Sequence, residues 1–358
     1  MVRLSCSYIP YEIPLAAGMP VTRDLFEGPI PEMEGHLPQD FCPYARAFIR
    51  QYGNNSIVVV AGSCDAMRRT YDVLDYWNLA EAVYYVDVPL IGSPEAVSFY
   101  AKELENLSHK FLDMTTLSKS EFLGRLMVTI NFTNEIRRRL SRTFNLMFEK
   151  KLSAAKATQL AINISKLPAP PYFQGNESFI QEIDEIINQV PLKSPRDNKD
   201  RPSIPVGISG TCLLDLSVIK CIENAGLDIA FIDSCISLRA YDFNICSENN
   251  NDPFHVLAEA YLNKPACPRM FQKETRVSRL LQLASDYDIQ GLIYFAPKFC
   301  DQAYYDSVEI RHGLKSSAGF PMLFLEGQYG SGKAGQAITR VEAFQEMLET
   351  TYMLRVGR

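Results

Sequence analysis

The sequence predicts an α/β fold with two doubly wound parallel-sheet lobes and a helical segment between them. Short apolar runs rich in β-branched residues, each followed by a turn and a helical pattern, recur on both sides of a long helical stretch. Alternation of strand and helix at this spacing is typical of parallel sheets. The chain has 358 residues, and at roughly 150 residues per domain this length allows two such lobes.

The first lobe is expected over residues 1–92. A β-branched strand over 56–60 leads through a glycine-containing turn into a helical pattern over 65–74, and a further strand follows over 82–88. This lobe is therefore built on a strand–turn–helix unit.

The helical segment is expected over 93–199. Ser93 is a predicted N-cap with proline at the first helical position, and Ser118 with Glu121 forms a capping box. The pattern stays helical to about residue 167, after which a proline-rich stretch over 168–204 flanks one amphipathic helix. We expect that stretch to cross between the lobes.

The second lobe is expected over 200–358. It repeats the strand–turn–helix unit and ends with a helix over 339–354. Its strands are expected over 204–208, 228–232, 290–295 and 322–325.

Composition excludes several classes of protein. With 47% hydrophobic and 22% charged residues, the chain has the composition of a folded globular protein. Its net charge of −6 argues against a nucleic-acid partner. The first residues do not resemble a signal peptide and no run approaches the ~20 apolar residues of a membrane span, so we expect a cytoplasmic protein without membrane contact.

Nine cysteines are unusual for a reducing compartment, where disulfides are rare. Cys64, Cys212, Cys235 and Cys300 each follow an apolar strand by a few residues, at the carboxyl edge where parallel sheets bind ligands. For any one of them, the alternative is a small buried side chain.

Three cysteines are the sharper candidates. Cys64 and Cys300 each precede an Asp at the start of a helical pattern, and Cys42 lies in a loop with two prolines. The positive end of a helix dipole lowers the pKa of a thiol and favours the thiolate, which is the form that binds metals. For Cys64 and Cys300 we therefore expect a lowered pKa and a role as ligand or nucleophile, and Cys42 is a third candidate.

The spacing of the cysteines indicates the kind of metal site. Structural zinc sites favour closely spaced cysteine pairs, and no two cysteines here are that close in the sequence. Widely separated thiols from two lobes fit an iron–sulfur cluster better. A Cys–His nucleophile is the weaker alternative, because none of the four histidines is spaced to pair with a cysteine.

A glycine-rich segment over 327–334 follows the last predicted strand and matches most of the pattern of a phosphate-binding loop. Its final position is Ala334, where that loop needs a hydroxyl for Mg²⁺. We expect a plain glycine-rich turn rather than an ATP site.

Several motifs together carry a resemblance to a known family. They are YIPYEIPLAAGM at 8–19, LPQDFCPYAR at 37–46, GSCDAMRRTYDVL at 62–74, VYYVDVP at 83–89, DSCISLRAYD at 233–242, PKFCDQ at 297–302 and GQAITRVEAFQEML at 335–348. In order and spacing they resemble the 2-hydroxyacyl-CoA dehydratase / benzoyl-CoA reductase family, and in particular the 2-hydroxyglutaryl-CoA dehydratase D component. The resemblance covers nearly the whole chain.

The resemblance implies two Rossmann-like lobes with a 4Fe-4S cluster between them, held by Cys42, Cys64 and Cys300. Three protein thiolates leave one iron open to a substrate oxygen. The implied activity is radical dehydration, or reduction, of an acyl-CoA thioester after one-electron activation. The implied partners are the acyl-CoA substrate, a paralogous subunit or second copy in a dimer, and a separate ATP-dependent iron–sulfur activator.

A branch of the same family holds a double-cubane cluster and reduces small molecules. Cys235 and Cys267 match additional ligands of that branch, but its sixth cysteine, shortly after the CPY-like motif, is absent here. Another alternative is a non-catalytic partner subunit whose cluster only relays electrons. The remaining cysteines are assigned to packing: Cys6, Cys212, Cys221 and Cys246.

For three charged residues in the motifs, the sequence allows either a functional or a purely structural role. Glu12 is a candidate acid–base residue near the cluster, and the alternative is a surface carboxylate at a helix start. Arg68 and Arg69 follow Cys64 and are expected either to face the cluster or a CoA phosphate, or to lie on a solvated helix face.

Overall fold

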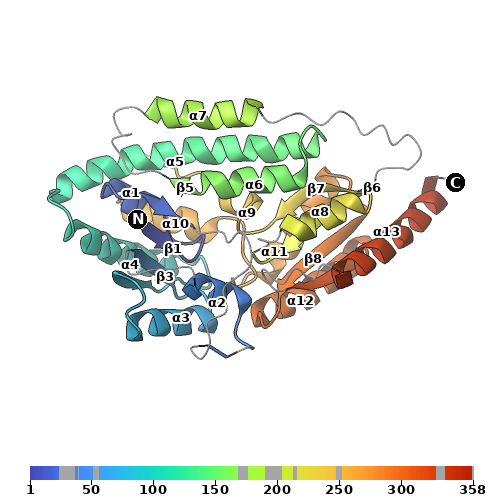
Figure 1. Ribbon diagram of the computed structural model, residues 1–358, viewed down its shortest axis with the longest axis horizontal. Coiled ribbons are helices and arrows are strands. Elements are labelled where there is room, and N and C mark those ends of the chain that lie inside the picture. Colours follow the sequence, from blue (N-terminus) through green and yellow to red (C-terminus); the bar gives the residue numbers. More distant parts are fainter. Residues whose placement is uncertain are drawn as a thin grey trace.

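The computed structural model describes residues 1–23, 37–38, 40–50, 56–167, 176–189, 204–212, 216–246, 252–327 and 335–356. Within these residues two mainly parallel sheets are covered by helices and share a large hydrophobic core (Figure 1). The predicted α/β fold class is therefore confirmed.

The first sheet has five strands in the order β4-β3-β1-β2-β5. They are β1 (Val2–Leu4), β2 (Val21–Thr22), β3 (Ile57–Ala61), β4 (Ala82–Val86) and β5 (Lys166–Leu167). The first four are parallel, and β5 is antiparallel to β2. All of β3 is buried, as expected for a β-branched strand that is covered on both faces.

The second sheet has four parallel strands in the order β7-β6-β8-β9. They are β6 (Ile204–Gly210), β7 (Leu227–Asp233), β8 (Gly291–Pro297) and β9 (Met322–Gly327). Gly210 ends β6 with a φ of 140°, and a Cβ there would meet the backbone oxygen of Phe295 at 2.0 Å. Only glycine fits this close approach, which brings the chain after β6 against the end of β8.

Helices cover both sheets. They are α1 (Glu12–Ala16), α2 (Pro43–Arg50), α3 (Asp65–Tyr76), α4 (Pro94–Leu112), α5 (Lys119–Phe148), α6 (Ala154–Ile164), α7 (Asn176–Gln189), α8 (Leu216–Asn224), α9 (Leu238–Tyr241), α10 (Pro253–Asn263), α11 (Lys273–Asp286), α12 (Asp301–Ala318) and α13 (Gly335–Val356). The long α5 runs across the molecule (Figure 1), packing on α1 beside the first sheet and on β7 and α9 in the second lobe.

The predicted strand–turn–helix units are present in both lobes, as are the Ser93 N-cap and the Ser118 capping box. The sequence does not indicate β1, which is too short to show a pattern. Residues 166–167 form β5 instead of ending a helix, because pairing with β2 satisfies their backbone groups. Most of the proline-rich stretch and of the glycine-rich segment lies outside the described residues, and the domain boundaries stay predictions.

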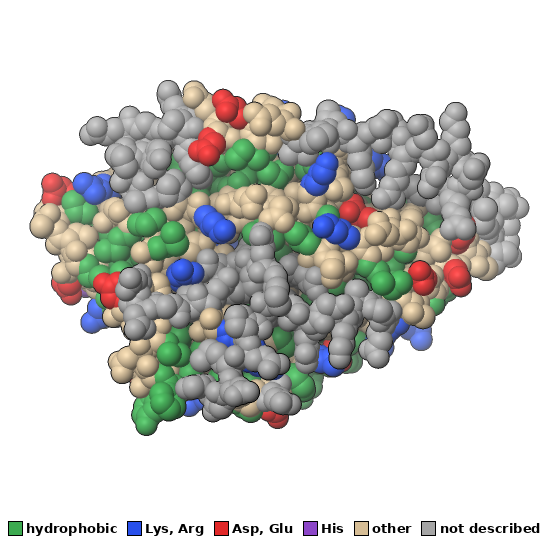
Figure 2. Space-filling model, viewed as in Figure 1, with side chains coloured by type: hydrophobic (Ala, Val, Ile, Leu, Met, Phe, Trp, Pro, Cys, Tyr) green, Lys and Arg blue, Asp and Glu red, His purple; other side chains and the backbone are tan. Residues whose placement is uncertain are grey.

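None of the helices in the described part of the chain is both long and apolar enough to cross a membrane. On the described part of the face in Figure 2, Lys and Arg side chains stand among Asp and Glu side chains rather than in one continuous stripe. This face therefore carries charges of both signs.

Candidate functional site

Five cysteines lie just past the carboxyl ends of parallel strands. They are Cys6 after β1, Cys64 after β3, Cys212 after β6, Cys235 after β7 and Cys300 after β8. The two carboxyl edges face each other, since the Gln302 amide donates to the backbone oxygen of Ser63 across the boundary, at 3.4 Å. We call this boundary between the sheets the seam.

Cys42, Cys64 and Cys300 stand at helix N-termini, which the sequence predicts for Cys64 and Cys300, whereas it places Cys42 in a loop. Cys64 is the N-cap of α3, Cys300 is the N-cap of α12, and Cys42 directly precedes α2. Each thiol accepts a hydrogen bond from a backbone N–H in the first turn of its helix. Phe299, directly before Cys300, has a φ of 58°, a strained conformation for a bulky residue that often marks a functional site.

The pKa values of these three thiols are raised, not lowered. Burial is the largest cause in each case, and it raises the pKa of Cys64 to about 11. Burial likewise raises the pKa values of Cys42 and Cys300, although backbone N–H donors act in the opposite direction. The prediction of lowered pKa values for Cys64 and Cys300 is therefore wrong for the chain without a bound group, because desolvation outweighs the effect of the helix N-termini.

The same three thiols influence one another electrostatically. Cys42 raises the pKa of both Cys64 and Cys300, and Cys64 raises that of Cys300. Among the described residues, no three His, Cys, Asp or Glu side chains are close enough to hold a single metal ion. A cubane differs because each thiolate binds a different iron, so its ligand sulfurs stand further apart than those around one ion. The described side chains therefore form no site for a single metal ion such as zinc.

Cys235 has partners that set it apart from these thiols. Arg23 donates from Nη2 to the Cys235 Sγ at 3.0 Å, and from Nη1 to the Cys235 backbone oxygen. The hydrogen bond with Cys212, together with Arg23 and Arg239, holds the pKa of Cys235 well below its ordinary value, although burial acts the other way. Even without a bound metal, these contacts therefore favour the thiolate form of Cys235.

Two cysteines that the sequence assigned to packing also lie at the seam. Cys6 raises the pKa of Cys64, Cys212 and Cys267, although burial is the largest cause in each case. The group at the seam, called the seam thiols below, comprises Cys6, Cys42, Cys64, Cys212, Cys235, Cys267 and Cys300. The other two cysteines lie elsewhere, since Cys221 is in α8 and Cys246 is exposed.

Three buried cations beside the seam thiols carry no signal in the sequence. Arg23 and Lys264 are each 3% exposed and Arg269 is 6% exposed. In the described part of the chain, none of the three forms an ion pair with a carboxylate. Burial lowers the pKa of Lys264 to about 7, while Cys6, Cys267 and Cys235 act to raise it. Basic residues are usually exposed, so only packing shows that these are not.

Glu12 is fully buried at the start of α1. Its Oε1 accepts hydrogen bonds from Arg137 Nη2 and Thr133 Oγ1, each at 2.6 Å, and its Oε2 accepts one from the Tyr261 hydroxyl at 2.8 Å. The alternative of a surface carboxylate is therefore wrong, because α1 packs against α5. With both oxygens bonded, the carboxylate is fixed in place, and its acid–base role stays a prediction.

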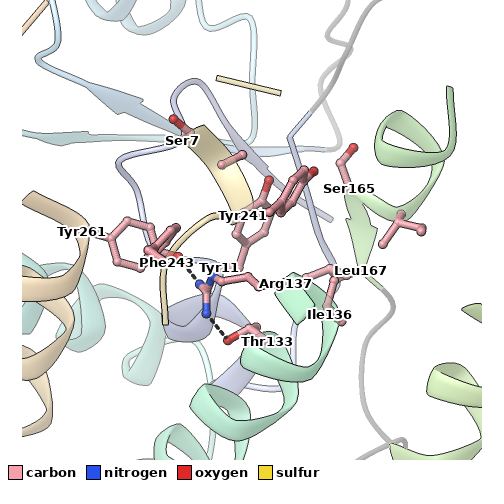
Figure 3. A pocket seen from close by; sticks show the side chains of 12 residues that line it. Ser7, Tyr11, Thr133, Ile136, Arg137, Ser165, Leu167, Tyr241, Phe243 and Tyr261 are labelled. Atoms are coloured by element: carbon pink, nitrogen blue, oxygen red, sulfur yellow. Dashed lines mark hydrogen bonds between the residues drawn. The ribbon is translucent and has the colours of Figure 1, made fainter. Parts of the chain in front are cut away.

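A small pocket lies next to this network. Figure 3 shows the Arg137 side chain reaching from α5 into the pocket between Thr133 and Tyr261. The cavity volume is about 30 Å³, enough for a water molecule. The other lining residues are Ser7, Tyr11, Ile136, Ile164, Ser165, Leu167, Ala240, Tyr241 and Phe243.

Arg68 and Arg69 lie on the exposed side of α3. Arg69 pairs with Asp72 at 2.6 Å, and Arg68 donates from Nε to the Tyr85 hydroxyl at 3.3 Å. Both side chains are more than half exposed. The structure thus supports the solvated helix face for both.

Comparison with known proteins identifies the same family as the sequence motifs do. The profile of the family described as 2-hydroxyglutaryl-CoA dehydratase, D-component, matches residues 6–348. The putative dehydratase subunit YjiM of Escherichia coli (strain K12) is 23% identical, over 97% of this chain and 91% of that protein. The (R)-phenyllactyl-CoA dehydratase beta subunit of Clostridium sporogenes is 22% identical, over 49% of this chain and 46% of that protein. The chain belongs to the 2-hydroxyglutaryl-CoA dehydratase D-component family.

Proposed function

We propose that this chain is an iron–sulfur subunit that dehydrates a 2-hydroxyacyl-CoA thioester, with a 4Fe-4S cluster held by Cys42, Cys64 and Cys300. The observation that carries the proposal is the meeting of these three thiols at the seam. Each stands at a helix N-terminus, and the three interact electrostatically although they are far apart in the sequence. Membership of a dehydratase family supports the reaction class.

The chemistry of the seam fits an anionic cluster. Thiolates are the ligands that iron–sulfur clusters take, and hydrogen bonds to the sulfurs tune them. Backbone N–H groups at the starts of α2, α3 and α12 already point at the three sulfurs. Buried cations cost free energy unless they are paired, so Arg23 and Lys264 imply a negative charge at this place.

When bound, such a cluster supplies one-electron chemistry and one iron without a protein ligand. This chain's own contribution is to hold the three thiolates and to donate N–H groups to their sulfurs. Arg23 compensates charge at Cys235. The Glu12–Arg137 pair fixes α1 and α5 beside the seam.

The partners are also proposed. Two relatives are named as subunits, which supports a dimer with a paralogous subunit or a second copy. A separate ATP-dependent iron–sulfur activator supplies the low-potential electron in this proposal. If the chain is instead a non-catalytic partner subunit, the isolated chain carries a cluster but no substrate reaches the open iron.

Anaerobic purification with iron and sulfide counts tests the cluster directly. We expect about four irons per chain and the EPR signal of a reduced cubane. Cys64→Ala should lose the cluster, whereas the matched control Cys221→Ala in α8 should keep it. A folded wild-type chain without iron would refute the proposal. Adding a 2-hydroxyacyl-CoA to the loaded protein, with EPR as the readout, then separates a catalytic subunit from an electron relay.

A second candidate is a double-cubane reductase of small molecules. The observation that favours it is the set of four further seam thiols, Cys6, Cys212, Cys235 and Cys267, where the sequence led us to expect two. About eight irons per chain would support it. In that case Cys235→Ala and Cys267→Ala should lower the iron count, whereas a single cubane on Cys42, Cys64 and Cys300 would leave it unchanged.

A further inference from the structure

Two buried cations enclose one tyrosine ring beside the seam thiols. The Lys264 Nζ lies 4.3 Å from the centre of the Tyr8 ring, and the Arg269 guanidinium carbon lies 4.4 Å from the same centre. The Tyr8 hydroxyl accepts a hydrogen bond from the backbone N–H of Cys267 at 3.3 Å. We call this unit, Lys264–Tyr8–Arg269, the cation stack.

Within the described part of the chain, the stack has no negatively charged partner of its own. The Lys264 ammonium donates to the backbone oxygen of Ser7, and Arg269 donates to the backbone oxygens of Val88 and Pro89. Neither cation has a carboxylate within ion-pair distance among the described residues. The Arg269 Nε is buried without a hydrogen-bond partner. Aromatic rings stabilise a cation only partly, so two like charges here leave a deficit of negative charge.

The stack is rigidly held. The Tyr100 hydroxyl donates to the Tyr8 backbone oxygen, and the Tyr8 and Tyr100 side chains are each at most 1% exposed. The Lys264 Nζ also lies 5.4 Å from the Tyr261 ring and 5.5 Å from the Phe243 ring. The side chains of Lys264 and Arg269 are therefore packed too tightly to move their charged groups into solvent.

The position of the stack shows where an anion belongs. Cys6 is two residues before Tyr8, and Cys267 lies between Lys264 and Arg269 in the chain. The charges of Cys6, Cys267 and Cys235 all act on Lys264. The positive charge of Arg23 acts on Lys264 in the opposite direction. The missing negative charge is therefore on the seam thiols or on what they bind.

Building on the proposed cluster, we propose that the cation stack is a fixed countercharge that raises the reduction potential of a cluster bound at the seam. Reduction adds one negative charge to a cluster, and buried positive charge nearby stabilises the reduced form. Lys264 and Arg269 are positioning residues in this proposal, because they act on the cluster through space and touch no reacting atom.

The test is a redox titration of the reconstituted protein, followed by EPR. Lys264→Met keeps the length of the side chain and removes the charge, so its reduction potential should fall. We expect at least a tenfold loss in the ratio of reduced to oxidised cluster at a fixed potential, which is about 59 mV for one electron. Lys264→Arg should stay near the wild type. Lys102→Met, on the exposed side of α4, is the control and should not change the potential.

A second measurement separates this role from simple packing. Without the cluster, removing an unpaired buried charge should raise the urea midpoint of Lys264→Met above that of the wild-type apoprotein, whereas a packing role predicts a lower midpoint. If Lys264→Met does not fold, Arg269→Gln undergoes the same titration with the same expected fall in potential. An unchanged potential in the folded variant overturns the inference alone. A wild-type chain that takes up no iron overturns the proposed function as well.

Discussion

Two groups of buried charge lie close together in this molecule, and they are built differently. In the compensated group, three carboxylates and three guanidinium groups pair with one another: Asp233, Asp242 and Asp306 with Arg239, Arg276 and Arg279. In the uncompensated group, Lys264 and Arg269 are buried without a carboxylate among the described residues. Arg23 lies beside them but pairs with Cys235. The first group begins at the last residue of β7 and joins α11 to α12, while the second lies beside the seam thiols.

The compensated group has the geometry of a structural network. Arg276 donates two hydrogen bonds to Asp306, from Nε to Oδ1 at 2.6 Å and from Nη2 to Oδ2 at 2.7 Å. The Tyr294 hydroxyl donates a third hydrogen bond to Asp306 Oδ2 at 2.6 Å. Such bidentate pairs are strong because both partners are charged and correctly oriented. The Arg276–Asp306 pair is thus satisfied within the chain, whereas Asp233 Oδ1, Arg239 Nε and Arg279 Nε are held by charge and not by hydrogen bonds.

The difference between paired and unpaired buried charges indicates where the functional site lies. A folded chain tolerates buried charge when it is paired, so an unpaired group points to an absent partner. Here Lys264 and Arg269, which lack a carboxylate among the described residues, lie beside the seam thiols, where we propose an anionic cluster. We expect the two groups to respond in opposite ways to loss of one charge.

The largest effect is expected in the compensated group. Asp306→Asn leaves Arg276 without its bidentate partner, and breaking a buried pair in this way costs about 3–5 kcal/mol of unfolding free energy. Urea unfolding of the apoprotein measures it. Asp286→Asn, on the exposed side of α11, is the control and should change stability little. Equal, small effects of both substitutions would contradict the comparison.

Glu12→Gln should turn a paired arginine into an unpaired one. Arg137 would keep Tyr261 and Thr133 as partners but lose the carboxylate, which we expect to cost about 2–3 kcal/mol because the lost hydrogen bond joins two charged groups. Urea unfolding checks this, with Glu105→Gln in the exposed pair to Lys119 as control. If Glu12→Gln abolishes turnover but leaves stability unchanged, the carboxylate has an acid–base role.

Acid should weaken the compensated group. Burial acts to raise the pKa of Asp233, but Arg239, Arg276, Arg279 and the Ser209 hydroxyl together hold it below its ordinary value. A carboxyl whose pKa is lowered on folding contributes stability above its unfolded pKa of about 4, and this contribution is lost as the pH falls through the folded value. The unfolding free energy of the wild type should therefore fall more steeply below pH 4 than that of Asp233→Asn. Parallel curves would count against a charged Asp233.

The smallest effect is expected at the surface. Arg69→Ala removes an exposed pair with Asp72 and should change the unfolding free energy by about 0.5 kcal/mol or less, because water screens such pairs. Iron content should be unchanged, since the side chain lies on a solvated helix face. A lower iron content in this variant would instead place Arg69 in the support of the cluster.

Much of the fold could be predicted from local pattern. The β-branched run at 57–61, the Ser93 N-cap and the capping box at Ser118 depend on residues within one helical turn or one strand, so the sequence indicates them directly. The placement of Cys64 and Cys300 at helix starts follows for the same reason. The family resemblance, now confirmed, rests on motifs that are equally local.

The rest of the site could not be predicted, because it depends on contacts between distant segments. The Tyr261 hydroxyl and Glu12 are 249 residues apart, and Lys264 and Ser7 are 257 residues apart. Cys6 and Cys212 join the other thiols only because two sheets bring their carboxyl edges together. No spacing rule along the chain contains that information.

The sequence alone therefore determined which thiols start helices and to which family the chain belongs. Only the tertiary structure decided the charge at the site. It raised the pKa values of Cys42, Cys64 and Cys300 and buried Glu12, and it placed no described carboxylate within ion-pair distance of Lys264 or Arg269. The physical reason is that helix capping is fixed by neighbours in the chain, whereas desolvation and charge pairing are fixed by whatever packs around a group.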